Sequence, residues 1–116
     1  MISVHVKFKM NIEEFGKVYW KEMLAFAHTA NTYAEKQAFR IWIYNLAKRF
    51  PCDRCRPHFI SYVEKNPPEN SLDPIIWVVQ FHNAVNKRLG KPVLSMKQAL
   101  QKYNENFNDC KNCKLS

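Results

Sequence analysis

The spacing of apolar residues constrains this chain more than any other feature, because most of it follows the period of an amphipathic helix. Between Asn11 and Ala30 the repeating positions are Phe15, Tyr19, Met23, Phe26 and Ala30. Only 2 of the 116 residues are glycine, which is poor material for hairpin turns or for a Gly-rich phosphate loop. We therefore predict an all-α protein.

Start and stop signals divide residues 11–108 into four helices and a short fifth helix, which predicts a four-helix bundle forming one domain. The second helix spans Ala34 to Leu46 and stops at Pro51, and the third opens at Cys52 and reaches about Lys65. The fourth helix is capped by Ser71 or Asp73, has Pro74 in its first turn and ends at Leu89 before Gly90. The fifth helix runs from Ser95 to about Phe107. Residues 66–70 read as a loop, residues 1–10 as an arm with strand-like alternation, and residues 109–116 as a polar tail.

The formal net charge of +8 fits a solvated basic surface or an anionic ligand or partner, such as a cofactor pyrophosphate, an acidic protein or a nucleic acid. No run of about 20 apolar residues is present, so we expect no membrane span. The first residues do not resemble a signal peptide, and we therefore expect a cytoplasmic location. Permanent structural disulfides are disfavoured in such a reducing compartment, so the cysteines need another explanation.

Two C-x-x-C pairs, Cys52/Cys55 and Cys110/Cys113, carry the chemical information. Together they could bind zinc, although the 54 residues of positions 56–109 separate them and are largely helical. Alternatively, Cys52 at a helix start beside Arg54 and Arg56 is a thiolate suited to disulfide exchange, with Cys55 as its resolving partner. Two hypotheses for the function of the chain therefore remain open. One is a zinc-stapled basic module that binds nucleic acid, and the other is a redox enzyme that needs a cofactor to accept electrons.

The fourth helix joins an apolar stripe to a polar one. Val78, Phe81, Val85 and Leu89 form the apolar stripe, which is predicted core, and His82, Asn83, Asn86 and Lys87 form the polar stripe. These polar side chains have two interpretations: they belong to a hydrated helix end, or they contact the planar ring of a ligand. In the second case Lys87, Arg88 and Lys91 are available to bind its phosphates. Gly16, Lys17, Tyr19 and Trp20 of the first helix offer a similar mixture of rings and charge.

Together these stretches resemble the Erv/ALR family of FAD-linked sulfhydryl oxidases over roughly Phe15 to Phe107. Three motifs carry the resemblance: Gly16 followed by Trp20; Pro51, Cys52, Cys55 and His58; and His82, Asn83, Val85, Asn86, Leu89, Lys91 and Pro92. The small size is similar to that of stand-alone members from large DNA viruses. The chain departs from the family at Leu24, where histidine is common, and at Tyr103 and Phe107, where tryptophan is common.

The resemblance implies FAD held at the mouth of the bundle, usually in a homodimer, and no nucleic acid. Cys55 is expected beside the flavin and Cys52 is expected to exchange with client protein dithiols, with dioxygen reduced to hydrogen peroxide. The implied cofactor contacts are Gly16, Lys17, Tyr19, Trp20, Leu24, Cys55, His58, His82, Asn83, Val85, Asn86, Lys87, Leu89, Lys91 and Tyr103.

The tail cysteines and the location complete these expectations. Cys110/Cys113 is expected to be a shuttle pair, with a structural disulfide as the alternative. For a viral member the expected location is the host cytoplasm or the virus factory. A further alternative, left open by Leu24, is a flavin fold retained as a scaffold without turnover.

Overall fold

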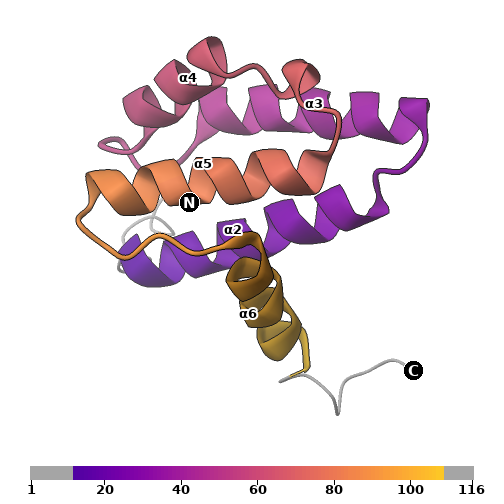
Figure 1. Ribbon diagram of the computed structural model, residues 1–116. Coiled ribbons are helices and arrows are strands. Elements are labelled where there is room, and N and C mark those ends of the chain that lie inside the picture. The colour runs from indigo at the N-terminus through magenta and orange to yellow at the C-terminus, as the bar shows by residue number, and fades with distance from the viewer. Residues whose placement is uncertain (1–11, 109–116) are drawn as a thin grey trace, which may run out of the picture.

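The computed structural model describes the backbone of residues 12–108 and the side chains from residue 16 onward, except those of 103 and 105–108. Its elements are α2 (Ile12–Thr29), α3 (Tyr33–Arg49), α4 (Arg56–Lys65), the short 3₁₀ helix η1 (Pro68–Asn70), α5 (Pro74–Arg88) and α6 (Met96–Asn108) (Figure 1). Every element in this described part is helical, which confirms the predicted all-α class. The predicted arm and tail lie outside the described residues. Within residues 12–108 no helix is both long and apolar enough to cross a membrane.

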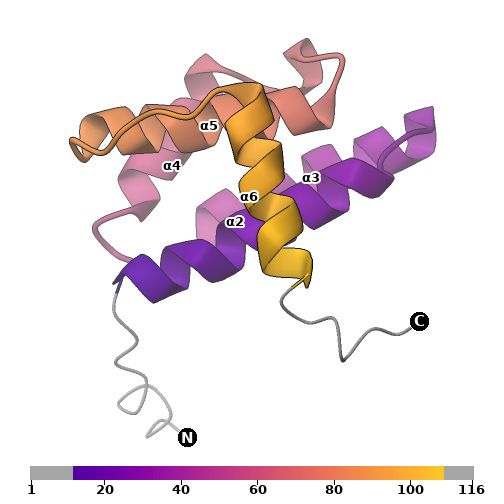
Figure 2. The same cartoon turned by 60° about the horizontal axis from the view of Figure 1, so that its bottom comes forward.

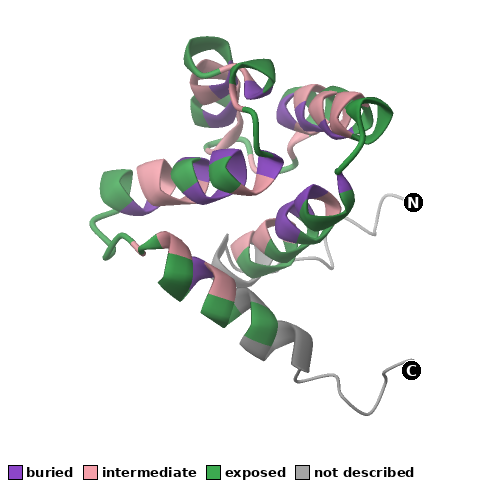
Figure 3. Cartoon of the chain, turned by 45° about the vertical axis from the view of Figure 1, so that its right-hand side comes forward, coloured by how far each residue is buried: buried purple, intermediate pink, exposed green. Residues whose placement is uncertain are grey.

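The bundle is built from two helix pairs. Helix α2 packs chiefly on α5, and α3 packs on α4, while α6 crosses both α2 and α5 (Figure 2). The inward faces of the helices carry the buried residues, and the outward faces are exposed (Figure 3). The largest fully buried side chains are Met23, Phe39, Ile43 and Val78, one or more from each of α2, α3 and α5. This arrangement is the predicted four-helix bundle with a short fifth helix.

The start of α4 differs from the prediction. The helix begins at Arg56 rather than at Cys52, and residues 53–55 form a turn before it. The carbonyl oxygen of Cys52 accepts hydrogen bonds from the backbone N–H groups of Cys55 at 3.1 Å and Arg56 at 2.9 Å. Pro57 occupies the first turn, where its missing N–H has no consequence and its fixed φ suits a helix. Cys55 is therefore the N-cap, and Cys52 lies in the preceding turn.

The ends of α5 follow the sequence signals. Asp73, rather than Ser71, caps the helix, since its Oδ1 accepts the N–H of Ile75 at 3.0 Å. At the other end the N–H of Lys91 donates to the carbonyl of Asn86 at 2.8 Å, and that of Gly90 donates to Lys87 at 3.2 Å. This pattern is a Schellman motif, and Gly90 has the positive φ of 75° that it requires.

Two predictions from the sequence need correction here. Leu89 was expected in the core, but it is 51% exposed because α5 ends at Arg88 and the chain turns away at Gly90. Val78 and Phe81, from the same predicted stripe, are buried. Residues 66–70 are not a simple loop, since Pro68–Asn70 form the 3₁₀ helix η1 and Tyr44 of α3 donates its hydroxyl hydrogen to Glu69.

Candidate functional site

A large cavity of about 970 Å³ opens between α2, α5 and the chain around the start of α4. The first half of α2, residues 50–59, the second half of α5 and the segment that leads into α6 all contribute to its wall. Its volume lies at the upper end of the range of about 300–1,000 Å³ that is usual for small-molecule and cofactor sites. The cavity is therefore large enough for a cofactor of nucleotide size or more.

Aromatic side chains form much of the cavity wall. The rings of Trp20 and His82 are stacked, with centroids 4.1 Å apart and planes 13° apart. Trp20 also meets Phe81 edge to face at 5.0 Å, and Tyr19 meets Phe50 in the same way at 5.0 Å. Edge-to-face contacts between neighbouring rings hold these side chains in fixed orientations. The wall thus offers rigid, flat and apolar surfaces suited to a planar ring system.

His82 and Asn86 place polar groups on this aromatic wall, one helical turn apart on α5. Burial lowers the pKa of His82 to about 4, and the positive charges of Lys102 and Lys91 add to this effect. The imidazole is therefore neutral at pH 7, with one nitrogen able to donate and the other able to accept a hydrogen bond. Asn86 is buried, and its side-chain amide makes no hydrogen bond to another described residue, so it is available to a ligand.

Positive charge surrounds the cavity. Six basic residues line it: Lys17, Lys21, Arg54, Arg88, Lys91 and Lys102. Among the described lining residues Asp53 is the one carboxylate, and its Oδ1 lies 2.8 Å from Nη2 of Arg56. Asp53 therefore forms an ion pair with Arg56, three residues further along the chain. The cavity favours a ligand with negative groups, such as a pyrophosphate.

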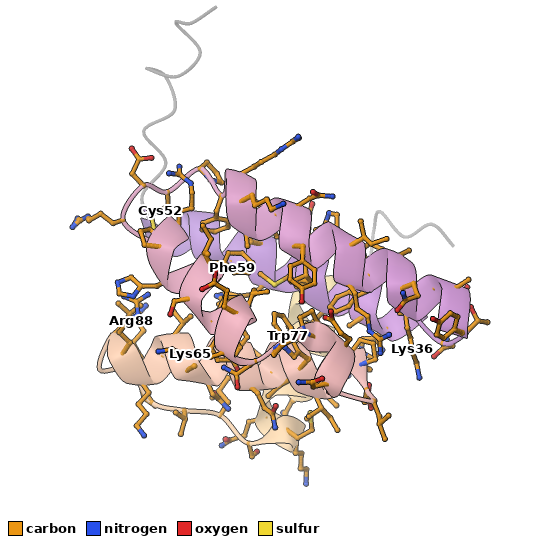
Figure 4. The ribbon with its side chains drawn as sticks, turned by 90° about the horizontal axis from the view of Figure 1, so that it is seen from above. Lys36, Cys52, Phe59, Lys65, Trp77 and Arg88 are labelled. Atoms are coloured by element: carbon orange, nitrogen blue, oxygen red, sulfur yellow. A yellow bond between two sulfur atoms is a disulfide. The ribbon has the colours of Figure 1, made fainter. Side chains whose placement is uncertain are left out.

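Cys52 and Cys55 form a disulfide, and Figure 4 marks Cys52 beside the start of α4. Cys55 belongs to the cavity lining, whereas Cys52 does not. The Sγ of Cys52 accepts a hydrogen bond from the backbone N–H of Cys55 at 3.2 Å, and Nε of Arg56 donates to the carbonyl oxygen of Phe50 at 2.8 Å. Together with the pair between Arg56 and Asp53, these contacts fix the turn that holds the cysteines. Cys55 thus lines the cavity, and Cys52 lies outside its lining.

Most of the residues predicted to hold a cofactor line the cavity. They are Gly16, Lys17, Tyr19, Trp20, Leu24, Cys55, His58, His82, Val85, Asn86, Leu89 and Lys91. Asn83 and Lys87 are not among the lining residues. Tyr103 lies on α6 but its side chain is outside the described part, and Cys110 and Cys113 are outside it altogether. The cofactor-binding role of each of these residues stays a prediction.

Asn83 has an evident structural task. Its side-chain amide donates to the carbonyl oxygen of Leu94 at 2.7 Å, and its Oδ1 accepts the backbone N–H of Leu94 at 2.8 Å. These two bonds hold the segment after Gly90 against α5, where Pro92 and Leu94 complete the cavity wall. Asn83 therefore supports the cavity wall without lining the cavity itself.

Several lining residues were not found from the sequence. Lys21 and Lys102 line the cavity, as do the apolar side chains of Phe50, Phe59, Leu94 and Ala99. Phe50 and Phe59 flank the C-x-x-C pair in the sequence, and this position could have predicted that they line the cavity. The contribution of Ala99 and Lys102 depends on the crossing of α6 over α2 and α5, which no local pattern encodes.

The fold and site define a helical domain that places a disulfide beside a cavity suited to a large, planar, anionic ligand. The chain belongs to the Erv1/Alr family, whose model matches residues 17–108. It is 36% identical over 98 residues to the FAD-linked sulfhydryl oxidase of African swine fever virus, with 80% of this chain and 82% of the relative covered. It is 29% identical to the FAD-linked sulfhydryl oxidase ERV2 of Saccharomyces cerevisiae, covering 78% of this chain and 49% of that protein.

Solved structures show the same fold. The FAD binding domain of Erv1 from Saccharomyces cerevisiae superposes with a TM-score of 0.71 at 23% identity, covering 83% of this chain and 96% of that chain. The yeast Erv1 core gives a TM-score of 0.71 at 22% identity. The alternative of a zinc-stapled nucleic-acid module gains no support from these comparisons. Within the described residues no group of three or more His, Cys, Asp or Glu side chains is arranged to hold a metal ion.

Proposed function

We propose that this chain is a FAD-dependent sulfhydryl oxidase that forms disulfide bonds in client protein dithiols and passes the electrons to dioxygen, giving hydrogen peroxide. One observation carries the proposal: Cys55, half of a disulfide, lines the same cavity as Trp20, His82 and Asn86. An oxidase of this kind needs its inner sulfur beside the electron acceptor and its outer sulfur within reach of the client. Membership of the Erv1/Alr family supports the same activity.

The residues of the cavity fit FAD. Trp20 and the neutral ring of His82 would contact a flat ring, and the amide of Asn86 would bond a polar edge of it. Lys17 and Lys91 would meet the pyrophosphate. When bound, FAD supplies the two-electron acceptor that an isolated dithiol lacks and hands the electrons on to dioxygen.

The cysteines divide the exchange with the client between them. A client thiolate attacks Sγ of Cys52, which lies outside the cavity lining, and the Cys52–Cys55 bond breaks, releasing Cys55 as a thiolate. The second client thiol, as its thiolate, then attacks the client sulfur of the mixed disulfide, closing the client disulfide and releasing Cys52. The client has lost two electrons and two protons, and Cys52 and Cys55 are reduced. The positive charge of Arg54 stabilises the thiolate forms.

The replacement of the common histidine by Leu24 leaves an apolar side chain, only 6% exposed, in the cavity wall. Such a wall still suits the apolar faces of a flavin, which favours an active enzyme over a scaffold without turnover. The activity is tested with Cys55→Ser and Cys52→Ser, using dithiothreitol as substrate. We expect Cys55→Ser to keep the yellow colour of bound flavin and to produce no peroxide. Normal peroxide production by that variant would refute the role of Cys55.

The tail cysteines are tested in the same assay. We propose that Cys110/Cys113 shuttles oxidising equivalents from Cys52 to protein clients. A variant with serine at both positions is then expected to oxidise dithiothreitol at the normal rate and a protein dithiol more slowly. Equal rates with both substrates would favour the alternative of a structural disulfide.

We further propose that the chain works as a homodimer. Exposed apolar side chains on the outer helices support a second subunit: Val18 on α2 is 47% exposed, and Tyr33 and Ile41 on α3 are 76% and 59% exposed. Sedimentation at several concentrations tests the oligomeric state. The predicted cytoplasmic or virus-factory location, and the division into arm, domain and tail, likewise stay predictions, to be checked by cell fractionation and limited proteolysis.

A further inference from the structure

A second, smaller hollow of about 190 Å³ lies between α4 and α5, and we name it the α4–α5 groove. Its lining residues are His58, Ser61, Tyr62 and Lys65 of α4 and Phe81, Ala84, Val85 and Arg88 of α5. Half of them, His58, Phe81, Val85 and Arg88, also line the large cavity, so the groove adjoins the proposed flavin site. Lys65 and Arg88 both belong to this groove and lie at the same side of the molecule in Figure 4.

The groove combines positive charge with aromatic rings. Lys65 and Arg88 are exposed, and neither forms an ion pair with another described residue. No carboxylate lines the groove within the described part of the chain. The rings of Tyr62 and Phe81, which also line the groove, stack with centroids 4.7 Å apart. Two cations in a groove lined by aromatic rings complement a peptide that carries carboxylates.

The groove runs away from the redox disulfide along one side of α4. Cys55 is the N-cap of α4, and the groove residues His58, Ser61, Tyr62 and Lys65 follow at spacings of three and four. At a rise of about 1.5 Å per residue, Lys65 lies about 15 Å along the helix axis from Cys55. An extended peptide covers that length in about four or five residues. The client sulfur would join Cys52, whose Cα lies 5.2 Å from that of Cys55, so residues about three to five positions from the client cysteine would reach the groove.

We propose that the α4–α5 groove docks an acidic segment of the client, with an aspartate or glutamate about three to five residues from the reacting cysteine held by Lys65 and Arg88. This inference rests on the proposed oxidase function and adds the class of substrate that the enzyme prefers. The groove adjoins the flavin cavity and shares Arg88 with it, and Lys65 adds a cation that is not part of the cavity lining. Docking there makes client selection depend on ionic strength, because exposed charges are screened by salt.

Binding is measured first, so that the test does not depend on turnover. The probes are two fluorescent peptides with serine in place of cysteine, identical except for two glutamates or two lysines three to five residues from the first serine. Fluorescence anisotropy with the full chain is expected to show the acidic peptide bound at least five-fold more tightly at low salt, with the preference shrinking in 0.5 M salt. Lys65→Glu should abolish the preference. Lys36→Glu, which changes a lysine of α3 away from the groove (Figure 4), should retain it.

Turnover separates the docking proposal from the oxidase proposal. With the cysteine-containing peptides, Lys65→Glu is expected to lower kcat/KM for the acidic peptide about five-fold while dithiothreitol oxidation stays unchanged. Equal binding of both peptides, or an acidic preference that survives Lys65→Glu, overturns the docking proposal and leaves the oxidase intact. Preferential binding of a single-stranded oligonucleotide through Lys65, with no binding of the acidic peptide, also overturns it. Absence of dithiothreitol oxidation by the unmodified chain would refute the proposed oxidase activity. The anisotropy measurement would still decide whether the groove binds an acidic peptide.

Discussion

The neutral imidazole of His82 makes the stability of the flavin-free protein depend on pH in a defined direction. Burial beside Lys102 and Lys91 lowers its pKa from 6.5 to about 4 in the folded chain. On acidification the unfolded chain binds a proton at this residue first, so the folded state loses stability as the pH falls from about 6.5 towards 4. Above pH 7 both states are neutral and the residue has no effect on the pH dependence.

The size of the effect follows from the shift of 2.5 pH units. At about 1.36 kcal/mol per unit the ceiling is about 3.4 kcal/mol, of which about 2.4 kcal/mol develops between pH 7 and pH 4.5. His82 keeps contact with solvent, and screening reduces this to about 1 kcal/mol. His82→Phe keeps a flat ring against Trp20 but cannot bind a proton. It should therefore remove about 1 kcal/mol of the difference in unfolding free energy between the two pH values.

Urea denaturation of the flavin-free protein at pH 7.0 and pH 4.5 measures this difference. Val78→Ala, a fully buried position without a titratable group, is the control for a general loss of stability. We expect the control to lower stability equally at both pH values, and His82→Phe to change mainly the difference between them. If His82→Phe leaves the pH dependence of the wild-type protein untouched, the imidazole is not held neutral by burial and the description of the cavity wall is incorrect.

Three further substitutions test how the cavity is shaped. In Gly16→Ala the new Cβ would lie 3.8 Å from Nε1 of Trp20, which is an ordinary contact. Thermal unfolding should therefore show a gain of about 0.5–1 kcal/mol in the free energy of unfolding, and titration should show weaker FAD binding. A loss of stability would contradict the open space at this position. Gly90→Ala meets no atom but must adopt the positive φ of 75°, and it should cost about 1–2 kcal/mol by chemical denaturation, whereas a neutral result would mean that the Schellman turn is not needed. Asn83→Ala removes both hydrogen bonds to Leu94, so it should lower the free energy of unfolding by about 1–3 kcal/mol and weaken FAD binding. Unchanged FAD affinity would show that the segment after Gly90 does not need these hydrogen bonds.

The helices could be predicted because their signals are local. Asp73, Pro74 and Gly90 delimit α5 through capping, a fixed φ and a positive φ, and each acts within a few residues of itself. The start of α4 was misplaced because two signals compete there. Arg56 and Pro57 begin the helix, while Cys52 is held in a preceding turn by hydrogen bonds to its carbonyl oxygen.

The site could be predicted only in part. His82 and Asn86 fell on one face of a helix, and the need of the C-x-x-C pair for an electron acceptor pointed to a cofactor. Asn83, next to His82 in sequence, points instead to the backbone of Leu94, a contact eleven residues away that depends on how the chain turns at Gly90. Lys102 joined the cavity through the crossing angle of α6, which arises from packing between helices far apart in sequence.

The central claim is that the sulfur of Cys55 faces a cavity that holds flavin. The most direct measurement is an anaerobic titration of the purified protein with dithiothreitol, followed by absorbance at about 450 nm, where oxidised flavin absorbs. We predict a yellow protein whose band is bleached by the dithiol and restored by air, and a Cys55→Ser variant that stays yellow without bleaching. A colourless protein that takes up no added FAD, or bleaching of the variant at the wild-type rate, would contradict the account.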